Sequence, residues 1–97
     1  MEEIIPENFG KMLRTLRVKA GLTLREICRE NNIDPGNYSR LERGLLDPPS
    51  CRDYVEYYAE LVRVNKKDTE MLVRMAYEHH EEKLKVDFRI KRFVDAI

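Results

Sequence analysis

The residues that could bind a metal or act as a nucleophile are few and poorly spaced in this 97-residue chain. The two cysteines, Cys28 and Cys51, lie far apart in the sequence, whereas zinc ligands usually come in close pairs. The two histidines, His79 and His80, are adjacent, so on a helix their side chains point in different directions. Nucleophile elbows, phosphate-binding glycine loops and zinc-protease helices are absent. We therefore expect no enzyme, no metal and no cofactor.

The charged residues favour an interaction surface instead. The 18 basic and 18 acidic side chains cancel, which argues against a polycation that coats nucleic acid by charge alone. The balance is uneven, because residues 8–52 contain nine basic and five acidic side chains whereas residues 53–97 contain nine and ten. A basic first half and a nearly neutral second half suit a DNA-binding face followed by a packing or pairing region.

The sequence also bears on the cellular compartment. Residues 1–6 are acidic and have no apolar run of the kind found in secretory signals. No stretch approaches the roughly 20 apolar residues of a membrane span. We expect a cytoplasmic protein with free thiols and no membrane partner.

Apolar residues recur at helical spacing through almost the whole chain. A first helix is expected over residues 8–20, stopped by Gly21. Thr23 and Glu26 form a capping box that begins a second helix, and Asn32 tolerates the left-handed backbone of a sharp helix exit.

A third helix is expected directly after this exit. Asp34 is a good cap and Pro35 fits the first helical position, while Gly44 stops the helix. The link between the second and third helices is short, which fixes them at a steep angle. In this arrangement one helix lies across the DNA backbone while the next enters the major groove.

The remaining residues predict two further helices and a tail. Ser50 can cap a fourth helix that reaches about Val64, and Asp68 can cap a fifth. Residues 84–97 show both strand-like alternation and helical spacing, and we favour a helix because the rest of the chain is helical. The fold class expected is all-α, in a single domain.

Three runs of residues resemble the lambda-repressor-like helix-turn-helix family of DNA-binding proteins. They are LRTLR at 13–17, AGLTLRE at 20–26 and YSRLERG at 38–44, and the resemblance covers residues 9–64. It implies a compact five-helix DNA-binding domain over residues 1–80. Residues 81–97 would then form a C-terminal extension for dimerisation or partner binding.

The resemblance implies a role for individual residues of the first three helices. Arg17 and Glu42 match an ion pair that joins the first helix to the third, and Arg17 can also reach phosphate. Asn37, Ser39 and Arg40 match the outward positions of the recognition helix, where Asn can bond adenine and Arg guanine. The full set expected to bind DNA is Arg17, Thr23, Arg25, Pro35, Gly36, Asn37, Ser39, Arg40 and Arg43.

Two of these positions depart from the family pattern. The family often places polar side chains that contact bases where this chain has Pro35 and Gly36. Proline has no amide hydrogen and glycine has no side chain, so base recognition falls on Asn37 and Arg40, or on apolar contact with a thymine methyl group. Arg25 and Arg43 have the alternative interpretation of solvated surface charges.

The fourth helix carries more apolar surface than a single core needs. Tyr54, Tyr57 and Leu61 widen its apolar face, and we expect them to form a dimer or partner contact together with Phe88 and Phe93. The alternative is that small bundles simply have wide apolar faces. Two modules related by a two-fold axis, about 34 Å apart, would recognise a palindrome.

The function expected is a sequence-specific transcriptional regulator, a repressor that binds double-stranded DNA as a homodimer. An antitoxin that binds a toxin protein and represses its own operon is the alternative, and the two are compatible. A protein-interaction module that no longer binds DNA is a third possibility, which the bare positions at Pro35 and Gly36 favour and the basic first half opposes.

Overall fold

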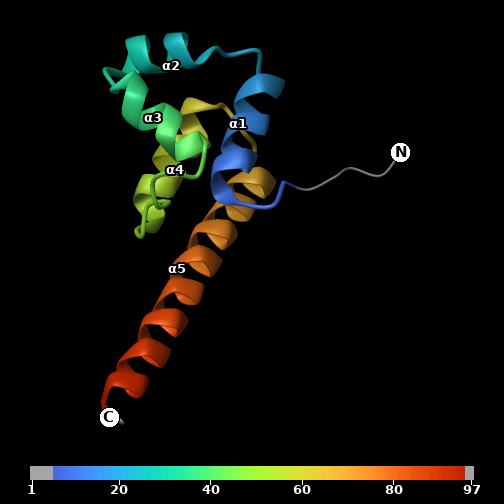
Figure 1. The fold of residues 1–97 in the computed structure, drawn as a ribbon. Helices are drawn as coiled ribbons and strands as arrows, with labels where there is room; N and C mark the ends of the chain where they lie inside the picture. The colour runs from blue at the N-terminus through green and yellow to red at the C-terminus, as the bar shows by residue number, and fades with distance from the viewer. Residues whose placement is uncertain (1–5, 96–97) are drawn as a thin grey trace.

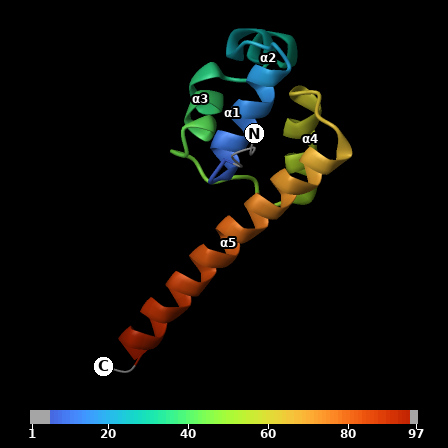
Figure 2. The same cartoon turned by 90° about the vertical axis from the view of Figure 1, so that its right-hand side faces the viewer.

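The computed structural model describes the backbone of residues 6–95 and the side chains of residues 6–82. The described backbone forms α1 (Phe9–Lys19), α2 (Leu24–Asn31), α3 (Pro35–Glu42), α4 (Arg52–Leu61) and α5 (Lys66–Asp95), with no strand. The first four helices and the beginning of α5 pack together, and the rest of α5 extends away from them (Figures 1 and 2). The predicted all-α fold is confirmed.

Side-chain caps begin the first three helices. The side-chain oxygen of Asn8 accepts a hydrogen bond from the backbone N–H of Lys11 at the start of α1. Thr23 Oγ1 accepts from the N–H of Glu26, and Asp34 Oδ2 accepts from the N–H of Asn37, as the sequence predicts. Each cap satisfies a backbone donor that has no partner within its helix, which typically contributes about 1 kcal/mol.

Two predicted caps are wrong. Cys51, not Ser50, occupies the cap position of α4, in extended conformation and without a side-chain cap bond. α5 begins one turn earlier than expected because Asn65, not Asp68, caps it: Asn65 Oδ1 accepts from the N–H of Asp68 at 2.9 Å. Asp68 therefore lies in the first turn, where its negative charge interacts favourably with the helix macrodipole.

The end of α4 also differs from the prediction. The helix ends at Leu61 instead of about Val64 because Arg63 adopts the left-handed conformation, with φ of 55°. The Val64 N–H then bonds back to the carbonyl of Ala59. This reversal lets Val64 pack against the core before α5 starts.

Residues 84–95 of the tail are helical, as favoured from the sequence. α5 runs without interruption from Lys66 to Asp95, which excludes a strand over that part of residues 84–97. At 1.5 Å per residue its 30 residues span about 45 Å. The expected boundary between residues 80 and 81 therefore falls within one continuous helix.

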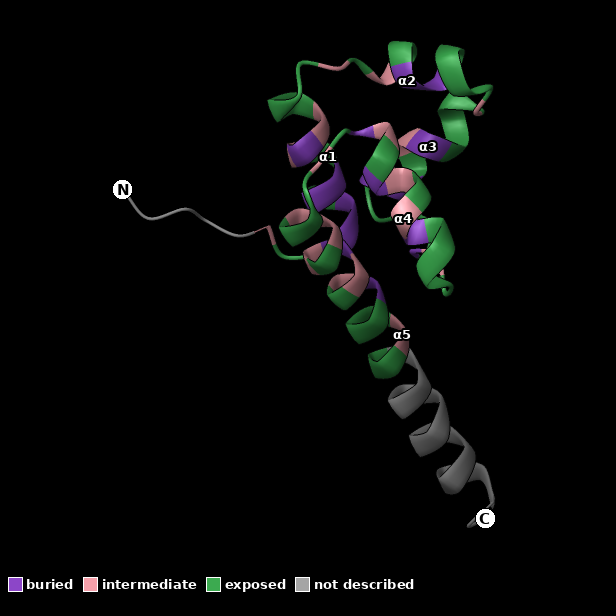
Figure 3. Cartoon of the chain, turned by 180° about the vertical axis from the view of Figure 1, so that it is seen from behind, coloured by how far each residue is buried: buried purple, intermediate pink, exposed green. Residues whose placement is uncertain are grey.

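The core lies between α1, α2, α3, α4 and the beginning of α5, all of which contribute buried residues (Figure 3). It is apolar apart from a tyrosine hydroxyl and a thiol, and it packs against the buried face of α3. Its buried members are Phe9, Met12, Leu13, Leu16, Ile27, Cys28, Tyr38, Leu41, Val55, Ala59, Val62, Leu72 and Ala76.

Candidate nucleic-acid interface

The turn between α2 and α3 is held at both ends. Asn32 has the left-handed conformation predicted for it, with φ of 53°, and its N–H bonds to the carbonyl of Cys28. The N–H of Ile33 donates to the same carbonyl at 2.9 Å, and the Ile33 side chain packs against the core. Because Asp34 then caps α3, a three-residue link fixes the direction in which α3 leaves α2.

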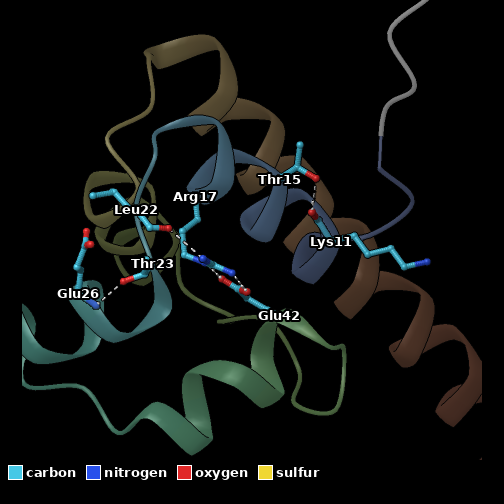
Figure 4. A network of polar contacts seen from close by, with 7 residues as sticks. All are labelled: Lys11, Thr15, Arg17, Leu22, Thr23, Glu26 and Glu42. Carbon is cyan, nitrogen blue, oxygen red and sulfur yellow. Dashed lines mark hydrogen bonds and ion pairs between the residues drawn. The ribbon is translucent and has the colours of Figure 1, made fainter.

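Arg17 and Glu42 join α1 to α3 (Figure 4). Arg17 Nε lies 2.7 Å from Glu42 Oε2 and Arg17 Nη2 lies 3.0 Å from Glu42 Oε1, a bidentate ion pair. Arg17 Nη1 donates to the carbonyl of Leu22 at 3.0 Å, so the same guanidinium also holds the loop before α2. The hydrogen bond with Glu42 raises the pKa of Arg17. The Arg17 side chain thus links α1, the loop before α2 and the end of α3.

Gly10 allows α1 and α3 to approach closely, and sequence reasoning missed it. A Cβ on Gly10 would lie 2.5 Å from the carbonyl oxygen of Leu41 and 2.6 Å from that of Glu42. Both are backbone atoms at the end of α3, so neither can move aside without moving the helix. A glycine inside a strong helical pattern is the signal that could have identified this contact.

Tyr38 on the buried face of α3 and Cys28 of α2 both belong to the core. Tyr38 is 2% exposed, its ring packs 6.2 Å from that of Tyr58, and its hydroxyl has no hydrogen-bond partner among the described residues. Burial, together with the nearby charge of Glu42, raises the pKa of Tyr38. Burial also raises the pKa of the Cys28 thiol. Both groups are therefore neutral members of the core.

The opposite face of α3 is open to solvent. Pro35, Gly36, Asn37 and Arg40 are exposed and Ser39 is half-buried. Arg40 Nη1 donates to Asn37 Oδ1 at 3.0 Å, so the structure brings together the two residues expected to contact bases. Within residues 6–82 no neighbouring element buries Asn37 or Arg40.

The other residues expected to contact DNA lie at helix ends. Thr23 and Arg25 are exposed at the start of α2, and Arg43 is exposed at the end of α3. The Thr23 oxygen accepts the cap bond from Glu26, which leaves its hydroxyl hydrogen free to donate. Arg17 differs from this group because its side chain is 12% exposed and already bonded within the protein.

The residues expected at a dimer or partner contact are in part accessible. On α4, Tyr54 is 65% exposed, Tyr57 is 41% exposed and Leu61 is half-buried. The ring of Tyr57 packs edge-on against Tyr58, which in turn packs against Tyr38 on the buried face of α3. Phe88 and Phe93 lie outside the described side chains.

The paired histidines contact the loop that follows α3. His79 Nε2 lies 3.0 Å from Asp47 Oδ1, and His80 Nε2 lies 2.7 Å from the carbonyl oxygen of Pro48. Among residues 6–82, no group of three or more His, Cys, Asp or Glu side chains is arranged to hold a metal ion.

Within the part of the chain that the structure describes, no helix is both long enough and apolar enough to cross a bilayer.

Comparison with known proteins agrees with this geometry. A family model described as a helix-turn-helix domain matches residues 8–72, which include α1 to α4 and the beginning of α5. Neither the curated proteins nor the solved structures contain a match.

Proposed function

The chain belongs to the helix-turn-helix domain family, and we propose that it is a transcriptional repressor that binds a palindromic operator as a homodimer. Membership of this family indicates a DNA-binding regulator. The observation that carries the proposal is the position of α3. The Arg17–Glu42 pair and the core hold one face of this helix, while the face with Asn37 and Arg40 stays exposed.

In the proposed complex α3 enters the major groove, which is about 12 Å wide and admits one helix. Asn37 and Arg40 contact base edges, with Ser39 beside them, while Pro35 and Gly36 allow close approach to the DNA. Thr23, Arg25 and Arg43 bind phosphates, helped by the unpaired backbone N–H groups at the start of α2. Arg17 acts by positioning α3, because three of its N–H groups already bond within the protein.

Two copies are needed because one α3 contacts only a short half-site. We propose that Tyr54, Tyr57 and Leu61 of α4 form the contact between them. Tyrosine suits such a contact, since its ring offers a large apolar area and its hydroxyl stays accessible to water. A repressor of this kind competes with polymerase for the promoter.

Selection from a pool of randomised duplexes, at low and at moderate salt, tests the proposal. Wild-type protein should enrich a palindrome, and its affinity should fall steeply as salt rises. R40A should relax the consensus at one position in each half-site. R25A should keep the consensus and reduce the salt slope by about 1, as expected for one lost phosphate contact. R74A, an exposed arginine of α5, is the matched control. Weak binding with no enriched sequence would refute the proposal.

A second proposed function, binding of a toxin protein by an antitoxin, is favoured by the projection of α5. The C-terminal part of this helix lies away from the other four helices (Figure 2). A long helix outside the bundle can lie in the groove of a partner protein. Co-expression with the product of the adjacent gene, followed by size-exclusion chromatography, tests this role. Separate elution of the two proteins would argue against it.

A further inference from the structure

The exposed side of Gly36 is occupied by the side chain of Arg40. A Cβ on Gly36 would lie 3.7 Å from Arg40 Nη1 and 4.0 Å from Arg40 Nη2. It would also lie 3.4 Å from Asp34 Oδ2, the atom that caps α3. The guanidinium has therefore folded back along the helix, over the glycine and toward the first turn.

This direction follows from helix geometry. Side chains on an α-helix lean toward its N-terminus, so a long side chain covers the residue four positions before it. A methyl group at position 36 would fit beside the guanidinium in ordinary van der Waals contact, whereas a longer side chain would displace it. Asn37 Oδ1 also accepts a hydrogen bond from Arg40 Nη1 at 3.0 Å. Arg40 is exposed, so this hydrogen bond and the space beside Gly36 place its guanidinium near the N-terminal end of α3.

The hydrogen bond leaves most donors and acceptors of the two side chains available for contacts with bases. Arg40 has five N–H donors and gives one to Asn37, so a bidentate pair with guanine O6 and N7 remains possible. Asn37 keeps both N–H donors and one lone pair on Oδ1 for a neighbouring base. The two side chains can thus contact adjacent bases without separating.

We infer that Gly36, Asn37 and Arg40 form one specificity-determining unit, in which the bare glycine makes room for Arg40 and Asn37 orients it toward guanine. The inference rests on the proposed DNA-binding function. It assigns Gly36 a positioning role: the position that lacks a base-contacting side chain of its own is filled by the guanidinium from one turn later. Asn37 and Arg40 then act together instead of contacting two bases independently.

The first test is a double-mutant cycle on the full chain, with the enriched duplex and the same duplex carrying a substituted guanine. N37A and R40A should each lower the preference for guanine about tenfold, as expected for a lost bidentate contact. N37A/R40A should lose little more than R40A alone, because both act through the same contact. R74A is the control for loss of one positive charge. Independent, multiplicative losses would overturn the inference.

The second test isolates the role of Gly36. In G36L the guanine preference should fall, since the larger side chain displaces the guanidinium, whereas G36A, whose Cβ would make only ordinary van der Waals contacts, should keep it. In an R40A background G36L should have no further effect on that preference. An equal effect with and without Arg40 would show that residue 36 acts on DNA directly and would overturn the inference.

The two proposals fail in different ways. If wild-type protein enriches no sequence, DNA recognition itself is refuted and this inference falls with it. If a consensus is enriched but the losses of guanine preference in N37A and R40A multiply in the double mutant, only the coupled unit is refuted. The hydrogen bond can also be followed without DNA, because R40A should shift the side-chain amide resonances of Asn37. Unchanged resonances would contradict the contact between them.

Discussion

Arg17 of α1 and Glu42 of α3 form a bidentate ion pair whose side chains are only 12% and 4% exposed. The pair lies 25 residues apart in sequence and closes the space between the end of α1 and the end of α3. Burial of two charges is favourable only when each is well paired. We therefore expect the protein to lose less stability when both residues are replaced by apolar ones than when only one of them is replaced.

Replacement of Glu42 by glutamine should lower the free energy of unfolding by about 3 kcal/mol, because Arg17 keeps its charge without a carboxylate. Urea denaturation followed by circular dichroism measures the change. R17M/E42L should recover part of the loss, since no charge is left unpaired. E56Q, which weakens the exposed pair between Arg52 and Glu56, is the control and should change little. Equal losses in E42Q and E56Q would show that the buried pair has no special role.

Gly10→Ala should destabilise the fold by about 1–3 kcal/mol, as overpacking does, although alanine is the better helix former. The added Cβ would lie 2.5 Å from the carbonyl of Leu41, so α1 and α3 must separate. Thermal unfolding checks the prediction, and G36A is the control because its Cβ would meet only ordinary contacts. A Tm for G10A at or above that of the wild type would contradict the close approach.

The stability of the protein should fall as pH rises above about 10, the ordinary pKa of tyrosine. Burial raises the pKa of Tyr38 in the folded state, so above that pH the unfolded chain loses a proton that the folded chain keeps. Fewer protons bound to the unfolded state means that the free energy of unfolding decreases with pH, by about 1.4 kcal/mol per pH unit for one group.

Tyr38→Phe isolates this effect. Denaturation over a series of alkaline pH values should show that the free energy of unfolding of the variant falls less steeply with pH, by the equivalent of one proton. Cys28 and Tyr58, whose pKa values burial also raises, account for the remaining slope. At neutral pH the variant should be at least as stable as the wild type, because it removes a buried hydroxyl that has no partner among the described residues. An unchanged alkaline slope would refute the role of Tyr38.

Substitution of Tyr57 by arginine should weaken self-association by at least tenfold in sedimentation equilibrium, because a charge would enter the proposed dimer contact. Y77R is the matched control: Tyr77 is also exposed, at 68%, but lies on α5 outside that contact. If Y77R weakens association and Y57R does not, the contact lies on α5 instead of α4.

The features predicted well from the sequence are those that depend on near neighbours. The Thr23 and Asp34 caps and the left-handed Asn32 each involve groups within four residues of one another. The start of α5 was predicted wrongly: Asp68 was expected to cap the helix, but Asn65 caps it and Asp68 lies in its first turn.

The contacts that the sequence did not reveal depend on tertiary structure or on side-chain rotamers. The role of Gly10 requires the distance between α1 and α3, which no pattern along the chain contains. The hydrogen bond from Arg40 to Asn37 requires a particular rotamer of a long side chain. The Arg17–Glu42 contact was anticipated only through resemblance to a family, since nothing local connects residues so far apart.

The most direct test of the central claim, that the exposed face of α3 contacts bases in the major groove, is protection of guanine N7 from methylation on the enriched duplex. Guanine N7 lies in the major groove, where Arg40 would bond to it. The wild-type protein should protect guanines in two half-sites about one helical turn apart, and R40A should lose protection at one guanine in each half-site while still binding. Protection by R40A at the same guanines, or no protection by the wild type on a duplex that it binds, would contradict the account.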